Sequence, residues 1–353
     1  MLNPPLLAGL QSVYIETARL RTHMITCGPA DGEVVILIHG NTATGRAFEE
    51  LMVALPAHLR AIAPDLRGYG RSAPAPVDAT RGMRDFSDDI AALAQTLGIQ
   101  RAHLVGWSLG GCIAMQYAID HPQAVASLTL LAPGSPYGFG ATRDLEGTPT
   151  NPDYSGSGGG LVNPEILRRM RAGDHSDDSP LSPINRIVST WFKPPFRPAR
   201  LDVLLEEFLL TTVGPDNYPG DSSPSEYWPG TGPGTRGVAC ALSPKYCNVS
   251  DIVHITPKPP ILWVRGDADR LVADGSLLDA GFLGQLGVLP GWPGAAVYPP
   301  QPMVGQTRAV LERYAAAGGR YRELVLEACA HSPHVERPDL FYPAFFAFLA
   351  TGF

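Results

Sequence analysis

The chain has 353 residues, of which 44% are hydrophobic and 17% are charged, and its formal net charge is -7 at pH 7. This composition is typical of a globular protein with a large core and excludes a disordered or fibrous chain. The negative charge and the lack of a basic run argue against nucleic acid or an anionic membrane surface as partner, and they favour a small neutral molecule.

The N-terminal segment and the cysteines bear on where the protein works. Residues 1–16 carry no positive charge ahead of an apolar stretch, and no later segment has about 18 consecutive apolar residues, so we expect a cytoplasmic protein that is neither exported nor membrane-spanning. The five cysteines are scattered and odd in number, which fits neither a disulfide framework nor a zinc site. They are Cys27, Cys112, Cys240, Cys247 and Cys329. A local bridge between Cys240 and Cys247 stays open.

Strands and helices alternate through the first third of the chain. Residues 11–39 predict two strands followed by a third, whose unbroken apolar run VVILI suits a strand buried on both faces. A strand near residues 61–64 and a helix over 83–97 follow, then a strand over 103–107, a helix over 109–120 and a strand over 125–133. This alternation predicts a doubly wound, mostly parallel sheet covered by helices on both faces, which is an α/β fold.

The pattern changes after Pro133. Residues 135–257 are rich in Gly, Pro, Ser and Asp, and only ILRRMRAG and RLDVLLEEFLLTTV have a helical pattern. Because a structureless loop of this length is unusual in a compact domain, we expect a cap subdomain inserted into a core made of residues 1–134 and 258–353. Trp191 and Trp228 of this segment, with Trp107 of the core, are candidates for substrate binding. The alternative is that the cap aromatics form the cap's own small core.

The sheet is expected to resume after the cap. ILWV at residues 261–264 predicts a strand, YRELVL predicts the last strand, and a final helix is expected over residues 338–349. A second insertion, residues 275–304, precedes a helix in QTRAVLERYAAAGG.

The strongest chemical signal is Gly106-Trp107-Ser108-Leu109-Gly110, placed where an apolar strand meets a helix. This G-x-S-x-G pattern predicts a nucleophile elbow, in which a sharp turn exposes the serine hydroxyl and leaves no room for side chains at the flanking glycines. The N-terminal amides of the following helix favour negative charge at the same place.

Two further motifs precede the elbow in order. His39-Gly40-Asn41 closes a predicted strand, and D-x-R-G-x-G-x-S spans residues 65–72. With these motifs the chain resembles the α/β-hydrolase fold family over almost its whole length outside residues 135–257 and 275–304. The resemblance implies that the amides of Leu109 and Asn41 form an oxyanion hole, and that residues 65–72 and His39 are structural.

The resemblance also implies a base for Ser108, whose hydroxyl is a poor nucleophile without one. His331 lies in CAHSPHVERP, between the last strand and the final helix, as the catalytic histidine of the family does. His334 is the rival, and we expect it to pack beside the site.

The acid implied by the resemblance is Asp269, three residues after Gly266, and it would orient His331. Asp267 is expected to brace the turn, and Asp274 lies deeper in the loop. The spacing of 62 residues between Asp269 and His331 is longer than the resemblance predicts.

These features predict a serine hydrolase that cleaves carboxylic esters or lactones of small to medium hydrophobic substrates through an acyl-enzyme on Ser108, with no metal or cofactor. A serine at the elbow disfavours hydrolysis of alkyl halides and epoxides, because the family members with those activities use aspartate there. A C–C bond hydrolase, an amidase, an acyltransferase or a perhydrolase would use the same elbow. A non-catalytic ligand-binding member of the fold is the alternative from another class.

Overall fold

Runs of buried apolar residues form one eight-stranded sheet. The computed structural model describes residues 4–353, so the first three residues of the N-terminal segment, on which the expectation about export rests in part, lie outside the described residues. The strands are β1 (Gln11–Glu16), β2 (Arg21–Cys27), β3 (Glu33–Ile38), β4 (Leu59–Pro64), β5 (Ala102–Trp107), β6 (Val125–Leu131), β11 (Ile261–Gly266) and β12 (Tyr321–Leu326). Their order in the sheet is β1-β2-β4-β3-β5-β6-β11-β12. Among these described strands, the pairs β1–β2 and β2–β4 are antiparallel and the other five pairs are parallel, so the predicted mostly parallel sheet is confirmed.

Alternating residues of the central strands enter two separate hydrophobic layers. In β3, Val34, Ile36 and Ile38 pack into the first layer. Val35 and Leu37 pack into the second. Because successive side chains of a strand point to opposite faces, an unbroken apolar run is what a strand covered on both sides requires.

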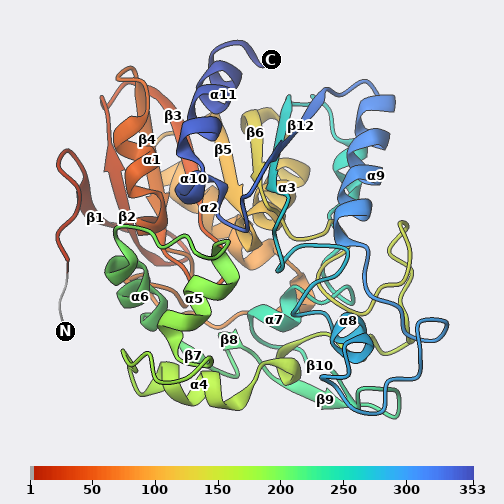
Figure 1. Cartoon of the computed structure of the whole chain (residues 1–353). Coiled ribbons are helices and arrows are strands. Elements are labelled where there is room, and N and C mark those ends of the chain that lie inside the picture. Colours follow the sequence, from red (N-terminus) through yellow and green to blue (C-terminus); the bar gives the residue numbers. More distant parts are fainter. Residues whose placement is uncertain (1–3) are drawn as a thin grey trace.

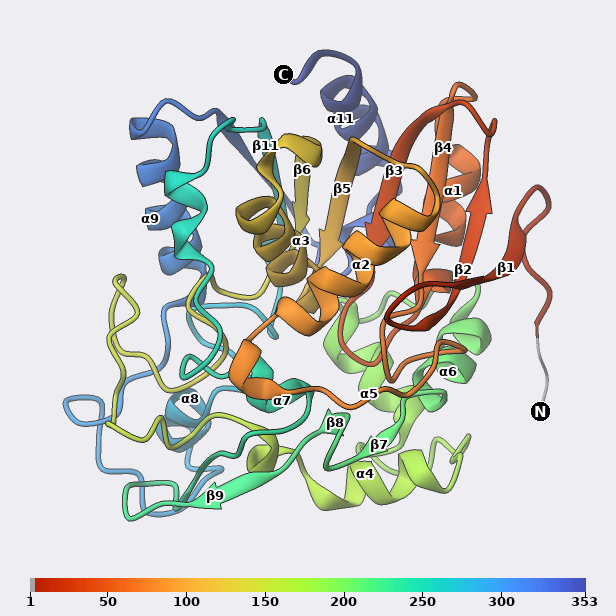
Figure 2. The ribbon, with the colours of Figure 1, turned by 180° about the vertical axis from the view of Figure 1, so that it is seen from behind.

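Helices cover both faces of the sheet. Figure 2 shows α2 (Arg84–Thr96) and α3 (Leu109–Asp120) in front of it. On the same face, α9 (Met303–Ala316) packs into the first layer through Val310, Leu311 and Tyr314. Figure 1 shows α1 (Glu49–Ala54), α10 (Pro333–Glu336) and α11 (Pro338–Thr351) in front of the opposite face. The helices predicted over 83–97, 109–120 and 338–349 are confirmed, whereas the short helices α1 and α10 had no clear pattern in the sequence.

The long segment between β6 and β11 holds short elements at one end of the sheet (Figure 1). They are α4 (Pro164–Arg171), α5 (Pro183–Trp191), α6 (Leu201–Leu209), β7 (Val213–Gly214), β8 (Tyr218–Pro219), β9 (Ser222–Pro224), β10 (Thr231–Pro233) and α7 (Val238–Ala241). The expectation of only two helices here was wrong, because α5 and α7 are also helical. INRIV in α5 is rich in β-branched residues, and its helix is stabilised by packing of Ile187 and Trp191 against the second layer.

The second insertion contacts this segment directly. It contains α8 (Ala280–Gln285). Tyr298 donates its hydroxyl to the Ser155 carbonyl at 2.8 Å, and Gln301 bonds to the backbone of Gly138 and Gly140. Residues 275–304 therefore pack with the segment that we predicted to form the cap, and the boundaries of a separate cap subdomain stay a prediction.

Candidate active site

Ser108 lies at the sharp turn between β5 and α3. Its backbone has φ 56° and ψ −116°, a conformation that non-glycine residues rarely adopt and that structures retain at functional sites. A Cβ atom at Gly106 would lie 2.3 Å from the Gly110 carbonyl oxygen, and one at Gly110 would lie 2.1 Å from that of Ile38. Both glycines are therefore required by close packing, as the elbow motif predicts.

His331 and Asp269 form a buried hydrogen-bonded pair. The His331 Nδ1 to Asp269 Oδ2 distance is 2.8 Å. The other carboxylate oxygen accepts the backbone N–H groups of Leu271 at 2.8 Å and Val272 at 3.2 Å. On the other side, the Trp107 indole donates to the His331 carbonyl at 2.7 Å. Ser108 and His331 line the same cavity, so the structure brings the three predicted residues to one place.

The rival acids lie in other environments. Asp267 is exposed, and its Oδ1 is 3.4 Å from the Cys329 N–H, which agrees with the expected role in the turn. Asp274 accepts the N–H groups of Val304 and Gly305 in the first turn of α9, where a carboxylate stabilises a helix. Asp269 is the one of the three that reaches His331.

The rival histidine packs among aromatic rings. His334 is 1% exposed and packs against the rings of Phe48 and Trp107, each with centroids 5.0 Å apart. Neither of its ring nitrogens makes a hydrogen bond of normal geometry to a described residue. Burial lowers the pKa of His334 to about 3, so the ring is neutral at pH 7. This packing agrees with the role expected from its position.

The two predicted oxyanion-hole residues flank Ser108. Leu109 is the first residue of α3, so its N–H has no partner within the helix, and both Leu109 and Asn41 line the cavity. The Tyr69 hydroxyl donates to Asn41 Oδ1 at 2.6 Å. His39 accepts the Leu66 N–H at Nε2, at 2.9 Å, and its Nδ1 donates to the Gly40 carbonyl at 2.8 Å. Burial lowers the pKa of His39 to about 4, so a neutral ring fixes the loop before Asn41.

The D-x-R-G-x-G-x-S stretch makes structural contacts. The buried Asp65 accepts the N–H groups of Gly45 at 3.0 Å and Arg71 at 2.9 Å, and His23 Nδ1 lies 2.7 Å from it. Arg67 binds both carboxylate oxygens of Asp89, at 2.6 and 2.8 Å. These bonds hold the loops beside the site, as expected from the resemblance.

The cavity at Ser108 has a volume of about 490 Å³. Its walls are mostly apolar and come from the ends of β3 and β5, from α4, α5 and α6, and from residues 271–289. Trp107 and Trp191 line it, and their rings meet edge to face. Trp228 does not belong to the described residues that line it. Its indole donates to the Pro290 carbonyl at 2.8 Å and its ring packs on Tyr298, so the structure gives no support to the predicted substrate contact of Trp228.

Sequence reasoning missed the charged residue of this cavity, Arg186 of α5. It is the one side chain with a permanent charge among the described residues of the lining. Since α5 was not predicted as a helix, nothing placed Arg186 on the same face as Trp191. The Pro183 that begins α5 was an available signal, because proline is favoured in the first turn of a helix.

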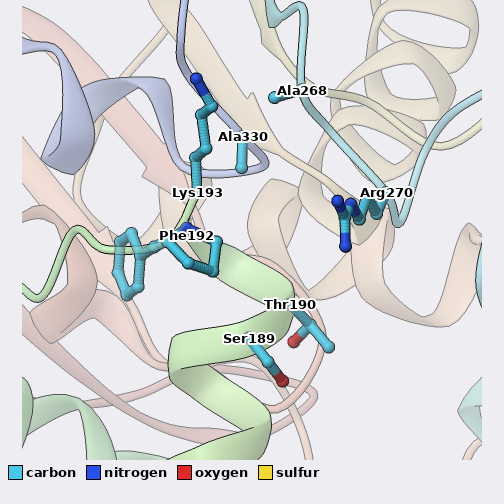
Figure 3. Close-up of a pocket in the computed structure, with 8 residues that line it drawn as sticks. Ser189, Thr190, Phe192, Lys193, Ala268, Arg270 and Ala330 are labelled. Atoms are coloured by element: carbon cyan, nitrogen blue, oxygen red, sulfur yellow. The ribbon is translucent and has the colours of Figure 1, made fainter.

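A smaller depression of about 50 Å³ lies between the end of α5 and the loops that carry the His331–Asp269 pair (Figure 3). Lys193 and Arg270 contribute its two cationic side chains, and Ala268 and Ala330 come from the loops. Thr190 lines both this depression and the cavity at Ser108.

The five cysteines are all free thiols, so Cys240 and Cys247 are not bridged. Burial raises the pKa of the Cys240 thiol, which favours the uncharged form. Within residues 4–353, no group of three or more His, Cys, Asp or Glu side chains is arranged to hold a metal ion. No helix in this range has the length and apolar character needed to cross a bilayer.

Comparison with known proteins agrees with the architecture. The sequence model of the alpha/beta hydrolase fold family matches residues 33–154. The 30 kDa subunit of magnesium chelatase from Rhodobacter capsulatus is 39% identical over 99 residues, 28% of this chain and 34% of that protein. Carboxylesterase YbfK from Bacillus subtilis is 28% identical over 128 residues, 36% of this chain and 43% of that protein. The matched part thus spans less than half the length of either relative.

A solved structure is similar over almost the whole chain. A serine hydrolase from Cycloclasticus zankles has a TM-score of 0.62 at 14% identity, and the superposition covers 98% of this chain and 99% of that one. At this identity the likeness shows the fold. The matched family model, the strand order and this structural likeness agree, and the chain has the α/β-hydrolase fold.

Proposed function

We propose that this chain is a serine hydrolase that cleaves carboxylic esters or lactones of small to medium hydrophobic substrates through an acyl-enzyme on Ser108. The observation that carries the proposal is the buried 2.8 Å hydrogen bond between His331 Nδ1 and Asp269 Oδ2, beside a cavity that His331 shares with Ser108. The carboxylesterase YbfK and the Cycloclasticus serine hydrolase are similar proteins whose names agree with this chemistry.

In the first half of the proposed reaction, His331 Nε2 takes the proton of Ser108 as its Oγ attacks the carbonyl carbon. The carbonyl π electrons move onto oxygen, and the amides of Asn41 and Leu109 donate to the resulting oxyanion. Asp269 fixes the tautomer that carries its proton on Nδ1 and stabilises the imidazolium. The oxyanion then collapses, and the leaving alcohol takes its proton from His331.

In the second half, His331 deprotonates a water molecule that attacks the acyl-enzyme. The Ser108 oxygen leaves with the proton from His331, which releases the acid and restores the free enzyme. Each of the two oxyanion donors contributes about 3 kcal/mol of barrier lowering in enzymes of this kind.

The apolar lining favours the acyl or alcohol part of a hydrophobic substrate. We propose that Trp107 and Trp191 contact it, and that residues 135–257 act as a cap over the cavity, joined by the second insertion. Closure over the cavity would exclude water from the oxyanion and strengthen its hydrogen bonds.

The test is active-site labelling followed by turnover measurements. A fluorophosphonate probe should label the wild-type protein, and peptide mass spectrometry should find the adduct on Ser108 rather than on Ser157, a second serine of the cavity lining. Ser108→Ala should lose both labelling and p-nitrophenyl butyrate hydrolysis. Unchanged ester turnover in this variant, or no labelling of a folded wild-type protein, would refute the proposal and favour a non-catalytic binding protein.

A further inference from the structure

Arg186 places a positive charge in the wall of a mostly apolar cavity. The side chain is partly buried and lies on the same helix as Thr190 and Trp191, which also line the cavity. Within residues 4–353 its guanidinium forms no ion pair and no hydrogen bond. Burial is the main influence on its pKa, which it lowers, and the neighbouring group with an opposing effect is the Tyr218 phenol rather than a carboxylate.

Other buried arginines of this chain have carboxylate partners. Arg46 is 3% exposed and pairs with Glu49 and Glu207. Arg67 is also buried and pairs with Asp85 and Asp89. This is the general rule, because removing a charge from water is costly unless an opposite charge and hydrogen bonds replace the hydration. Arg186 departs from this rule, and it lines a cavity in which a bound molecule could supply the missing acceptor.

The groups that face Arg186 across the cavity do not neutralise it. The lining contains no Asp or Glu among the described residues, and its titratable members besides Arg186 are Tyr218 and His331. Burial raises the pKa of Tyr218 to about 12, so this phenol is neutral at pH 7. The Asp269 carboxylate beside the cavity is engaged by His331 and by two backbone N–H groups.

The remainder of the lining limits what the charge can bind. Leucine and valine side chains of residues 271–289 and the aromatic rings of Trp191 and Phe208 form a large apolar part of the wall. An anion that enters must therefore carry an apolar body. A single guanidinium matches a singly charged carboxylate, which it binds through two parallel N–H donors, whereas a phosphate dianion would keep one charge unpaired here.

We propose that Arg186 is a specificity-determining residue that binds a free carboxylate on the substrate, so that the preferred substrates are half-esters or lactones that carry both a reactive acyl bond and a carboxylate joined by an apolar chain. This inference rests on the proposed function, and it replaces the neutral substrate expected from composition with an anionic one. The negative net charge of the chain does not oppose it, because screening weakens distant charges while Arg186 lies within the cavity.

The experiment compares matched ester pairs. Hydrolysis of the monoethyl esters of succinic, glutaric, adipic and suberic acids is followed in a pH-stat, each against the ethyl ester of the monocarboxylic acid with the same number of carbons. We expect kcat/KM for at least one half-ester to exceed that of its neutral partner. In Arg186→Gln, the ratio of half-ester to neutral ester should fall by about tenfold or more, the effect of losing a hydrogen bond between charged groups. Arg186→Lys should restore part of the ratio.

The matched control is Lys193→Gln. It removes a positive charge near the end of α5, but Lys193 is exposed and lines the separate depression of Figure 3. This variant should keep the wild-type ratio, which separates local binding from a general change in net charge. Equal ratios in wild type and Arg186→Gln at every chain length, or an equal fall in Lys193→Gln, would overturn the inference.

A binding measurement separates failure of this inference from failure of the proposed function. Monoethyl adipate is titrated into Ser108→Ala and into Ser108→Ala/Arg186→Gln, with calorimetry as the readout. Binding that weakens about tenfold or more in the double variant supports the carboxylate site even if wild type hydrolyses no ester. If wild type hydrolyses neutral esters and the two variants bind monoethyl adipate equally, the carboxylate site at Arg186 is refuted and the proposed hydrolase function stands.

Discussion

Substitution of Asp269 by asparagine tests the geometry of the proposed catalytic triad most directly. In the structure, Asp269 Oδ1 accepts two backbone N–H groups while Oδ2 faces His331 Nδ1 at 2.8 Å. An asparagine must keep its carbonyl oxygen toward the two N–H donors, which points its NH₂ group at the imidazole. The ring nitrogen that faces it must then be an acceptor.

The forced tautomer carries its proton on His331 Nε2, which therefore cannot accept the proton of Ser108. Loss of the correct tautomer and of the negative charge behind the imidazolium should lower kcat by about 10³-fold or more, or ~4 kcal/mol of barrier. The assay is kcat for p-nitrophenyl butyrate at pH 7, with thermal unfolding to verify that the variant is folded.

The matched controls are the two neighbouring acids. Asp267→Asn keeps an acceptor for the long contact from the Cys329 N–H, and Asp274→Asn keeps an acceptor at the first turn of α9. Both should retain kcat within about threefold. The reasoning is refuted if folded Asp269→Asn keeps more than a tenth of wild-type kcat, or if Asp267→Asn loses as much.

Three further substitutions test buried groups. The free energy of unfolding of His334→Phe should match that of wild type within about 1 kcal/mol at pH 7 and exceed it by about 2 kcal/mol at pH 5. The reason is that the His334 ring takes up a proton near pH 6.5 in the unfolded chain, whereas its pKa in the folded protein is about 3. Equal pH dependence of the two proteins in urea unfolding would contradict this. For Asp279 the pH dependence of stability has the opposite sign, because burial raises the pKa of its carboxyl to about 6. Wild type should therefore lose up to about 3 kcal/mol of stability between pH 4 and 7. The same unfolding series should show no such loss in Asp279→Asn. In Gly40→Ala, the new Cβ would lie 3.1 Å from the Ser108 Cβ, and stopped-flow acylation should slow about tenfold or more; an unchanged rate would mean that the loop shifts without cost.

The buried strands and the candidate site residues could be predicted from the sequence, because the constraints that fix them act over short stretches of the chain. An apolar run such as Val34–Ile38 is required by burial on two faces, and Gly106 and Gly110 are required by contacts below 2.5 Å at the elbow. Each of these constraints leaves a recognisable residue at a fixed distance along the chain. The predicted acid and base follow strands β11 and β12, so the sheet itself brings them together.

The segment between β6 and β11 could not be predicted in the same detail, because its structure depends on contacts between residues that are distant in sequence. Helix α5 has weak intrinsic propensity and is stabilised through Ile187 and Trp191 by the second hydrophobic layer. Trp228 illustrates the same limit. Its residue type is common in pockets, but its indole donates a hydrogen bond to the carbonyl of Pro290, 62 positions further along the chain.

The long spacing between Asp269 and His331 has its explanation in the same contacts. The backbone N–H of Val272 is the last group along this loop that donates to Asp269. The chain then leaves the sheet to form residues 275–304 before it returns through α9. Leu277, Leu283 and Leu289 of this excursion line the cavity, and its far end is held by Tyr298 on the Ser155 carbonyl. The extra length therefore leaves the hydrogen bond to His331 intact and enlarges the wall of the cavity. We therefore propose that two insertions determine substrate selectivity, of which α5 supplies the charge and residues 275–304 supply much of the apolar surface.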